Sequence, residues 1–295
     1  MRLVTFEDGK GARVGVHDVE SNTIVDLSAS TRLPKDMTAF VALGKNGLSR
    51  ARKAVKSGEG RIPFESVKLL APFPRPAKNI LCVGKNYHEH AKEFHNSGFD
   101  ASAGANAIPD VPIMFTKWPN SVIGPGEAIP SANDYTNSVD YEGELTVVMG
   151  EGGRNIPQKR AYKHVYGYTI INDVTARTLQ NRHKQWFLGK SPDGFCPMGP
   201  CIVTADEIKD VTQLRLITKV NGELRQDAHV SQLIFDIPRL IEDLSKVMTL
   251  EPGDLIATGT CAGVGIGFNP PKYLKPGDRV AITIEPIGTL ENPVA

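Results

Sequence analysis

The chain has 295 residues, of which 40% are hydrophobic and 23% are charged, and its formal net charge is +1. This length allows one large domain, or a core domain with a small companion, and the composition excludes a largely disordered chain. A near-neutral charge without a basic run excludes nucleic acid or an anionic membrane as the main partner, and no apolar run approaches the length of a membrane span. The first residues form a strand-like run rather than a leader, and the four cysteines make no C-x-x-C pair, so we expect reduced thiols and a cytoplasmic protein.

Residues 1–70 predict a small N-terminal domain. Short strands separated by turn residues are expected at 3–6, 12–16 and 23–27, and a helical pattern follows at 37–57. No cluster of chemically useful residues stands out, so we expect a supporting role. A Pro-rich segment then leads into a main domain covering 71–295.

The main domain opens with a buried strand at 79–84 and a helix start at 85–94. His90 and Glu93 are three residues apart and would share a face of this helix. A carboxylate beside an imidazole can fix its tautomer and raise its basicity, which suits a general base. The plainer alternative is a pair of surface side chains. A zinc-protease motif is excluded, because position 92 is lysine instead of the histidine that H-E-x-x-H requires.

The next segment, 95–111, is rich in Gly, Ala, Ser and Asn, which predicts a mobile loop that could cover a site. Further strands are expected at 112–117 and 121–126.

An acidic pair follows. Glu142 and Glu144 lie two residues apart in a strand-like run, so their side chains would project from the same face and repel each other unless a cation lies between them. Asp173 follows a second apolar run, 165–171. Three carboxylates without Cys or His suit a hard divalent cation such as Mg²⁺, Mn²⁺ or Ca²⁺. The alternative is a solvated acidic face.

A polar helix is expected at 176–187. The following segment, 189–200, contains so many Gly and Pro residues that we expect neither helix nor central strand there. Lys190 in this loop could reach a substrate oxyanion, or it could be solvated. Later strands are expected at 214–220, 254–258 and 279–285.

Two turn signals and one helix complete the chain. Asn221-Gly222 predicts a hairpin turn, and 235–248 has helical periodicity with Pro238 in its first turn. The glycine-rich segment 258–267 is no dinucleotide fingerprint, because the Phe-Asn-Pro-Pro run after it would not begin a helix. Its backbone could instead approach a small anion. Many short strands with few helices predict a mostly-β roll or sandwich.

Six motifs in order resemble the fumarylacetoacetate hydrolase family over roughly residues 70–290. They are Gly84-Lys85-Asn86-Tyr87 with His90 and Glu93, Tyr141-Glu142-Gly143-Glu144-Leu145, Asn172-Asp173-Val174-Thr175-Ala176-Arg177, Gly189-Lys190-Ser191, Asn221-Gly222, and Thr258-Gly259-Thr260 with Gly263-Val264-Gly265. The N-terminal unit is similar to the fumarylacetoacetase-domain-containing branch that includes acylpyruvases and oxaloacetate tautomerases and decarboxylases. Two departures concern the pocket: Cys261 stands where the family often has Pro, and the loop after Lys190 reads Ser-Pro-Asp-Gly-Phe.

The resemblance implies a mixed β-roll with a small α+β N-terminal domain, a bound Mg²⁺ or Mn²⁺, and a homodimer. By motif position the roles would be as follows: Glu142, Glu144 and Asp173 as metal ligands, His90, Glu93 and Lys190 as catalytic residues, and Thr260, Gln226, Tyr87 and Arg177 as substrate contacts.

A small 2-oxo acid is the implied substrate, since its carboxylate and keto oxygens can chelate a metal that stabilises an enolate. Three hypotheses stay open. Hydrolytic C–C cleavage of an acylpyruvate is slightly preferred. Tautomerisation or decarboxylation of oxaloacetate would use the same residues. A non-catalytic metal- or metabolite-binding scaffold would show no turnover.

Overall fold

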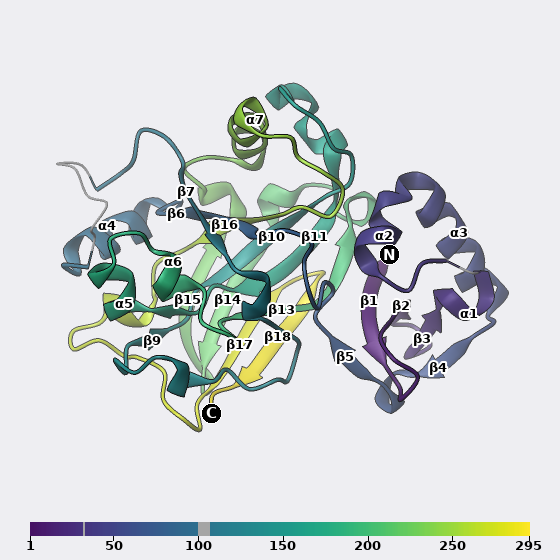
Figure 1. Cartoon of the computed structure of the whole chain (residues 1–295), viewed down its shortest axis with the longest axis horizontal. Coiled ribbons are helices and arrows are strands. Elements are labelled where there is room, and N and C mark those ends of the chain that lie inside the picture. Colours follow the sequence, from purple (N-terminus) through teal and green to yellow (C-terminus); the bar gives the residue numbers. More distant parts are fainter. Residues whose placement is uncertain (32, 100–106) are drawn as a thin grey trace.

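The N-terminal unit lies beside a larger body that carries the rest of the chain (Figure 1). The computed structural model describes residues 1–31, 33–99 and 107–295. The unit contains β1 (Arg2–Glu7), β2 (Arg13–Asp18), β3 (Thr23–Asp26), β4 (Arg61–Pro63) and β5 (Lys68–Leu70), with α1 (Leu27–Thr31), α2 (Met37–Ala42) and α3 (Gly44–Ser57). The first three strands confirm the prediction. The single helix predicted at 37–57 is instead two helices, because Gly44 has a φ of 53° that interrupts helical geometry.

A long mixed sheet runs through both parts of the molecule. Its order is β4-β3-β2-β1-β13-β11-β10-β16-β6-β7, and β1 joins the unit to the body by antiparallel pairing with β13. The body strands are β6 (Ile80–Gly84), β7 (Ile113–Lys117), β8 (Val122–Ile123), β9 (Val139–Asp140), β10 (Gly143–Met149), β11 (Val165–Asn172), β12 (Thr175–Ala176), β13 (Cys196–Thr204) and β16 (Leu255–Thr260). The division at residue 70 stays a prediction.

β13 corrects the expectation that 189–200 holds no central strand. It lies between β1 and β11 in the sheet. Its prolines are tolerated because the pairing is irregular. Gly199 pairs with Ile170 and Val203 with Tyr168, so Pro200 falls in a bulge where it has no ladder position to fill.

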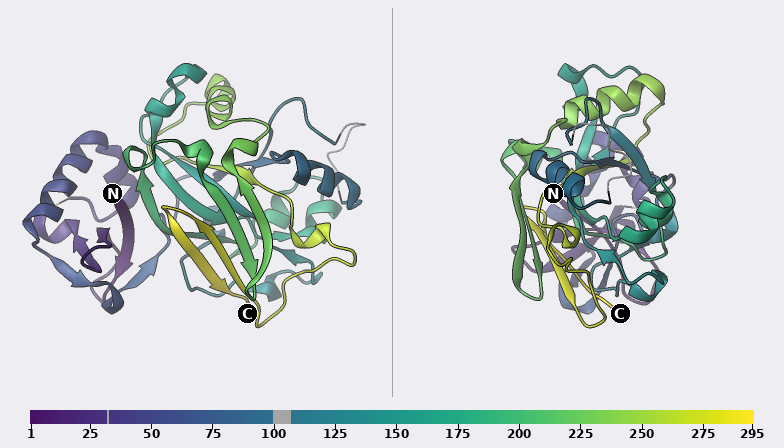
Figure 2. Two further views of the ribbon diagram at one scale, coloured as in Figure 1. Left: turned by 180° about the vertical axis from the view of Figure 1, so that it is seen from behind. Right: turned by 90° about the vertical axis from the view of Figure 1, so that its left-hand side faces the viewer.

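The second sheet covers one side of the first near the start of β10 (Figure 2). It has the order β15-β14-β17-β18 and comprises β14 (Arg215–Val220), β15 (Glu223–His229), β17 (Arg279–Ile284) and β18 (Gly288–Pro293). The turn between β14 and β15 is the predicted Asn221-Gly222, with φ values of 51° and 81°, as a tight hairpin requires. The mostly-β prediction is confirmed.

The remaining helices are α4 (His88–Asn96), α5 (Arg177–Arg182), α6 (Phe187–Lys190) and α7 (Ile237–Val247). α7 begins as predicted, with Pro238 in its first turn and the Asp236 side chain accepting a hydrogen bond from the N–H of Arg239. The helix predicted at 176–187 is shorter, because Lys184 has a left-handed φ of 60°. The predicted loop 95–111 includes residues 100–106, which lie outside the described residues.

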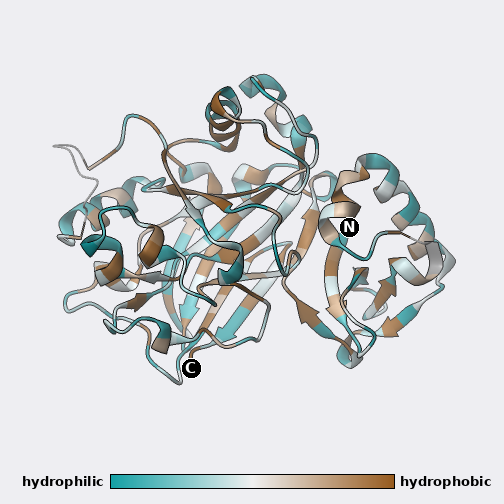
Figure 3. Cartoon of the chain, in the orientation of Figure 1, coloured by the Kyte–Doolittle hydropathy of each residue, from teal (hydrophilic) through white to brown (hydrophobic). Residues whose placement is uncertain are grey.

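Hydrophobic side chains from both faces of the long sheet form the core, and they show as brown stretches along the strands (Figure 3). All four cysteines are free and buried, and burial raises the pKa of the Cys196 thiol to about 12. In the described part of the chain, none of the helices has the length and apolar character that a membrane crossing requires.

Candidate active site

Three buried carboxylates converge where β10 and β11 meet. Gly143 pairs with Asn172 across these two strands, and this register places Glu142, Glu144 and Asp173 next to one another. One oxygen from each of the three side chains lies within 4.8 Å of the others. All three side chains are at least 95% buried, so the solvated acidic face considered from the sequence does not describe them.

Backbone hydrogen bonds hold this cluster in place. The N–H of Asp173 donates to the carbonyl of Glu142 at 2.8 Å. The N–H of Gly259, at the end of the neighbouring strand β16, donates to Oε2 of Glu144 at 2.9 Å. Glu144 therefore lies on β10 itself, and Glu142 and Asp173 lie immediately beside the ends of β10 and β11, where their backbones are joined.

Cationic side chains surround the cluster. Lys190 Nζ lies 2.9 Å from Glu142 Oε2 and 2.7 Å from Asp173 Oδ2. Arg177 Nη1 lies 2.7 Å from Glu142 Oε1. Lys190 is 2% exposed, which rules out the solvated lysine that the sequence left open. It closes α6 instead of lying in a loop.

The charges act unequally on the two glutamates. Burial alone would raise the pKa of Glu142, but the nearby Lys190 and Arg177 lower it to about 2. Burial together with repulsion from Asp173 and Glu142 raises the pKa of Glu144 well above its ordinary value. Of the two glutamates, Glu144 is therefore the one that would gain more from an added positive charge.

His90 and Glu93 form a pair on α4. His90 Nδ1 lies 3.0 Å from Glu93 Oε2, and the other carboxylate oxygen of Glu93 accepts a hydrogen bond from the N–H of Gly263 at 2.9 Å. The His90 side chain is 5% exposed, so it is no surface histidine. The pair fixes one ring nitrogen and leaves Nε2 for proton transfer.

One small cavity is lined by Glu142, Arg177, Lys190 and His90, whereas Glu144, Asp173 and Glu93 lie behind its lining. Its lining residues in the described chain are Val83, Gly84, Lys85, His90, Phe94, Phe115, Glu142, Arg177, Gln180, Trp186, Lys190 and Thr260. Arg177 Nη2 is buried and has no hydrogen-bond partner among the described residues, so it offers a donor to an anionic ligand.

Two predicted substrate contacts do not line this cavity. Gln226 is buried behind it, where its amide donates to Thr260 Oγ1 at 2.7 Å and accepts from the N–H of Gly143 at 3.0 Å. Tyr87 is buried and pairs with Leu233 in an isolated β-bridge. Gln226 therefore supports Thr260, and direct contact with a substrate stays a prediction for both residues.

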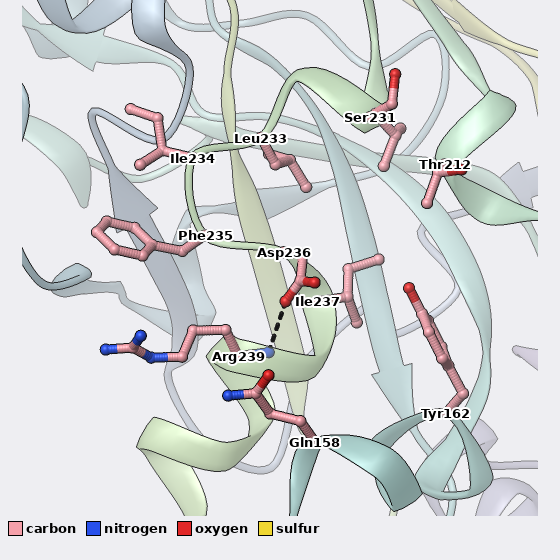
Figure 4. Close-up of a pocket in the computed structure, with 11 residues that line it drawn as sticks. Gln158, Tyr162, Thr212, Ser231, Leu233, Ile234, Phe235, Asp236, Ile237 and Arg239 are labelled. Atoms are coloured by element: carbon pink, nitrogen blue, oxygen red, sulfur yellow. Dashed lines mark hydrogen bonds between the residues drawn. The ribbon is translucent and has the colours of Figure 1, made fainter.

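A second pocket lies at the start of α7, lined by residues of the loops before it and by Tyr162 (Figure 4). It includes none of the residues predicted for the site. The Asp236 carboxylate accepts a hydrogen bond from the N–H of Arg239 in the first turn of α7, and the Arg239 side chain extends away from Asp236 (Figure 4). The small cavity, where charged groups converge, is therefore the candidate site.

Three buried residues around the cluster had no role predicted from the sequence. Lys117 ends β7, and its Nζ lies 2.7 Å from Asp173 Oδ1. Asp140 accepts from Arg177 Nε at 2.9 Å, and Gln180 Oε1 accepts from Arg177 Nη1 at 3.2 Å. Only the spacing of Gln180, three residues after Arg177 on a helix, could have indicated its place.

Comparisons with known proteins agree with this architecture. The family described as fumarylacetoacetate (FAA) hydrolase C-terminal matches residues 79–295. Oxaloacetate tautomerase YisK of Bacillus subtilis is 46% identical over 291 residues, which cover 94% of each chain.

Two solved structures share the whole fold. A fumarylacetoacetate hydrolase from Exiguobacterium antarcticum is 40% identical with a TM-score of 0.83, and the match covers 100% of this chain and 99% of that one. A maleylpyruvate hydrolase from Sphingobium sp. SYK-6, in complex with manganese (II) ion and pyruvate, is 30% identical with a TM-score of 0.80 and the same coverage. The chain therefore belongs to the fumarylacetoacetate hydrolase family of enzymes, as its motifs predicted.

Proposed function

We propose that this protein is a divalent-metal-dependent enzyme that interconverts the keto and enol forms of a small 2-oxo acid, with oxaloacetate as the first candidate. The observation that carries the proposal is the buried carboxylate cluster beside Lys190, Arg177 and the His90–Glu93 pair. The choice of oxaloacetate rests on the 46% identity to a tautomerase over nearly the whole chain. A homodimer is also expected, and its mass in solution would test this.

The residues fit a hard cation. Lys117, Arg177 and Lys190 pair with Asp173, Asp140 and Glu142, whereas Glu144 is repelled by the Glu142 and Asp173 carboxylates within 4.8 Å of it and would be stabilised by a bound cation. Oxygen ligands suit Mg²⁺ or Mn²⁺, and Mn²⁺ accompanies pyruvate in the maleylpyruvate hydrolase. Glu142, Glu144 and Asp173 would hold the ion, which when bound polarises a keto oxygen as a Lewis acid.

The other side chains supply charge and proton transfer. Lys190 and Arg177 place positive charge beside the cluster, where an enol oxygen would develop negative charge. His90, with Nδ1 held by Glu93, can take a proton from the carbon next to the ketone through Nε2 and return it to oxygen. Burial strengthens each of these electrostatic interactions because it excludes water.

Hydrolysis of an acylpyruvate is the second candidate. It is supported by the oriented His90, which could instead take a proton from a water molecule that attacks the distal carbonyl. The structural similarity to a maleylpyruvate hydrolase also favours it. Decarboxylation of oxaloacetate would need the same charges but no base.

One set of assays separates these reactions. The decay of enol-oxaloacetate, the release of CO₂ and the release of pyruvate from acylpyruvates are followed with Mg²⁺, with Mn²⁺ and after chelation. We expect metal-dependent enol decay above the spontaneous rate, lost in Glu144→Gln and kept in Glu223→Gln, whose side chain is 56% exposed. Pyruvate release without enol decay would favour the hydrolase. Metal binding with no turnover would favour the scaffold.

A further inference from the structure

Asn86 is a fully buried amide at the junction of β6 and α4. Its Nδ2 donates to the carbonyl of Phe235 at 3.0 Å and to that of Thr258 at 2.7 Å. Its Oδ1 accepts from the N–H of Phe235 at 2.8 Å. Both donor hydrogens are therefore used, and both reach backbone atoms far away in the sequence.

The local backbone explains why an amide is needed there. Lys85 has a left-handed φ of 56°, which ends β6 and its parallel pairing with β16. The Asn86 side chain then bonds the next carbonyl of β16 in place of a backbone N–H. Gly259 permits this approach, since a Cβ there would lie 2.7 Å from the Cβ of Asn86.

The hydrogen bond to Thr258 leads directly to the carboxylate cluster. The carbonyl of Thr258 and the N–H of Gly259 belong to one planar peptide group. The Asn86 side chain donates to the oxygen of this peptide group, and the N–H of Gly259 at its other side donates to Glu144 Oε2 at 2.9 Å. A rotation of the peptide plane would move the N–H of Gly259 away from Glu144. Hydrogen bonds in such a chain also strengthen one another.

The other contacts of Asn86 fix the start of the helix that carries His90. The carbonyl of Asn86 accepts from the N–H of Ile234 at 2.9 Å, and Tyr87 pairs with Leu233 just before α4 begins. Figure 4 shows Leu233, Ile234 and Phe235 along the loop that leads into α7. This loop, residues 233–235, is thus the fixed support from which α4 starts.

We propose that Asn86 is a positioning residue that fixes α4, the helix that carries His90, and the Glu144 carboxylate relative to each other. The inference rests on the proposed function, because Glu144 is taken as a metal ligand. Groups behind metal ligands commonly change metal affinity or activity by roughly 10- to 100-fold when mutated. Asn86 positions the ligand Glu144 through the Thr258–Gly259 peptide and also fixes the start of the helix that carries His90. Its loss therefore affects metal binding and turnover together.

The test compares Asn86→Asp with a matched variant, Asn292→Asp. Asn292 on β18 is also buried and donates to two carbonyls, those of Gly124 and Glu127, both at 2.8 Å. We expect both variants to lower the melting temperature by similar amounts. Only Asn86→Asp should raise the dissociation constant for Mn²⁺, measured by titration calorimetry, and lower kcat, each by roughly 10-fold or more.

The outcomes separate the inference from the proposed function. If the wild type binds no Mn²⁺, the proposed function fails. If the wild type binds Mn²⁺ and Glu144→Gln does not, but Asn86→Asp binds and turns over like Asn292→Asp, the positioning role alone is wrong. Should Asn86→Asp not fold, Asn86→Ser, which removes the carbonyl acceptor and shortens the donor, takes its place in the same comparison.

Discussion

Replacing Glu144 with glutamine should stabilise the metal-depleted protein and destabilise the metal-loaded protein relative to wild type. Glutamine keeps the acceptor for the N–H of Gly259 but removes the charge. Two charges within 4.8 Å of each other repel by about 3 kcal/mol or more at an effective dielectric constant of 20. Glu144 has two such neighbours, Glu142 and Asp173, and Lys190 offsets part of the repulsion. We therefore expect a net gain of about 1–3 kcal/mol.

Thermal unfolding after chelation and with added metal measures the effect of Glu144→Gln on the metal-depleted and the metal-loaded protein. For a chain of this size the gain corresponds to a rise of roughly 2–5 °C in the melting temperature after chelation. A free metal concentration about 1,000 times the dissociation constant should stabilise wild type by about 4.1 kcal/mol, whereas a site with two carboxylates should gain much less. The order of melting temperatures should therefore reverse. Glu223→Gln, which removes an exposed charge, controls for net charge. If Glu144→Gln lowers the melting temperature after chelation, or if Mn²⁺ raises it as in wild type, the electrostatic reasoning is wrong.

Three further changes test separate parts of the structure. Lys117→Met should cost up to about 3–5 kcal/mol in urea unfolding, because it removes one of the two cationic partners of the buried Asp173 and leaves only Lys190; a cost below 1 kcal/mol would contradict this. Arg13→Met should destabilise the N-terminal unit. Burial raises the pKa of Asp26, but hydrogen bonds from Ser28 and Arg13 and the charge of Arg13 lower it below its ordinary value. The Arg13–Asp26 pair therefore stabilises the fold above the unfolded pKa of about 3.8, and this contribution is lost as the pH falls through the folded pKa. The variant should therefore show a flatter acid limb in its stability–pH curve, and an unchanged limb would refute the assignment. Gly267→Ala would place a Cβ 1.9 Å from Glu93 Oε1, so kcat should fall roughly 10-fold or more as the base loses its orientation, and full activity would show that this contact is unimportant.

The sequence predicted the parts of the site that depend on local spacing. Glu142 and Glu144 are two apart on a strand, and His90 and Glu93 are three apart on a helix, so each pair lies together for geometric reasons. That these two pairs lie close to each other was predicted only from the family resemblance, because their proximity depends on the strand order. The register between β10 and β11, which brings Asp173 to the glutamates, cannot be read from either strand alone.

Long-range hydrogen bonding explains what the sequence did not reveal. Lys117 and Asn86 have no local pattern of chemical interest, and their partners Asp173 and Thr258 lie on other segments of the sheet region, far away in the sequence. β13 was missed because Gly and Pro oppose strand formation locally, and only its neighbours in the sheet override this preference. Lys190 was placed in a loop for the same reason.

The central claim is that Glu142, Glu144 and Asp173 bind one divalent cation. Anomalous diffraction from a crystal soaked in Mn²⁺ and oxalate tests it most directly. We expect a single strong peak with an oxygen of each carboxylate at about 2.0–2.6 Å, and oxalate on the side of His90 and Lys190. A peak elsewhere, or a cluster that excludes the ion while Lys190 still bridges Glu142 and Asp173, would contradict the account.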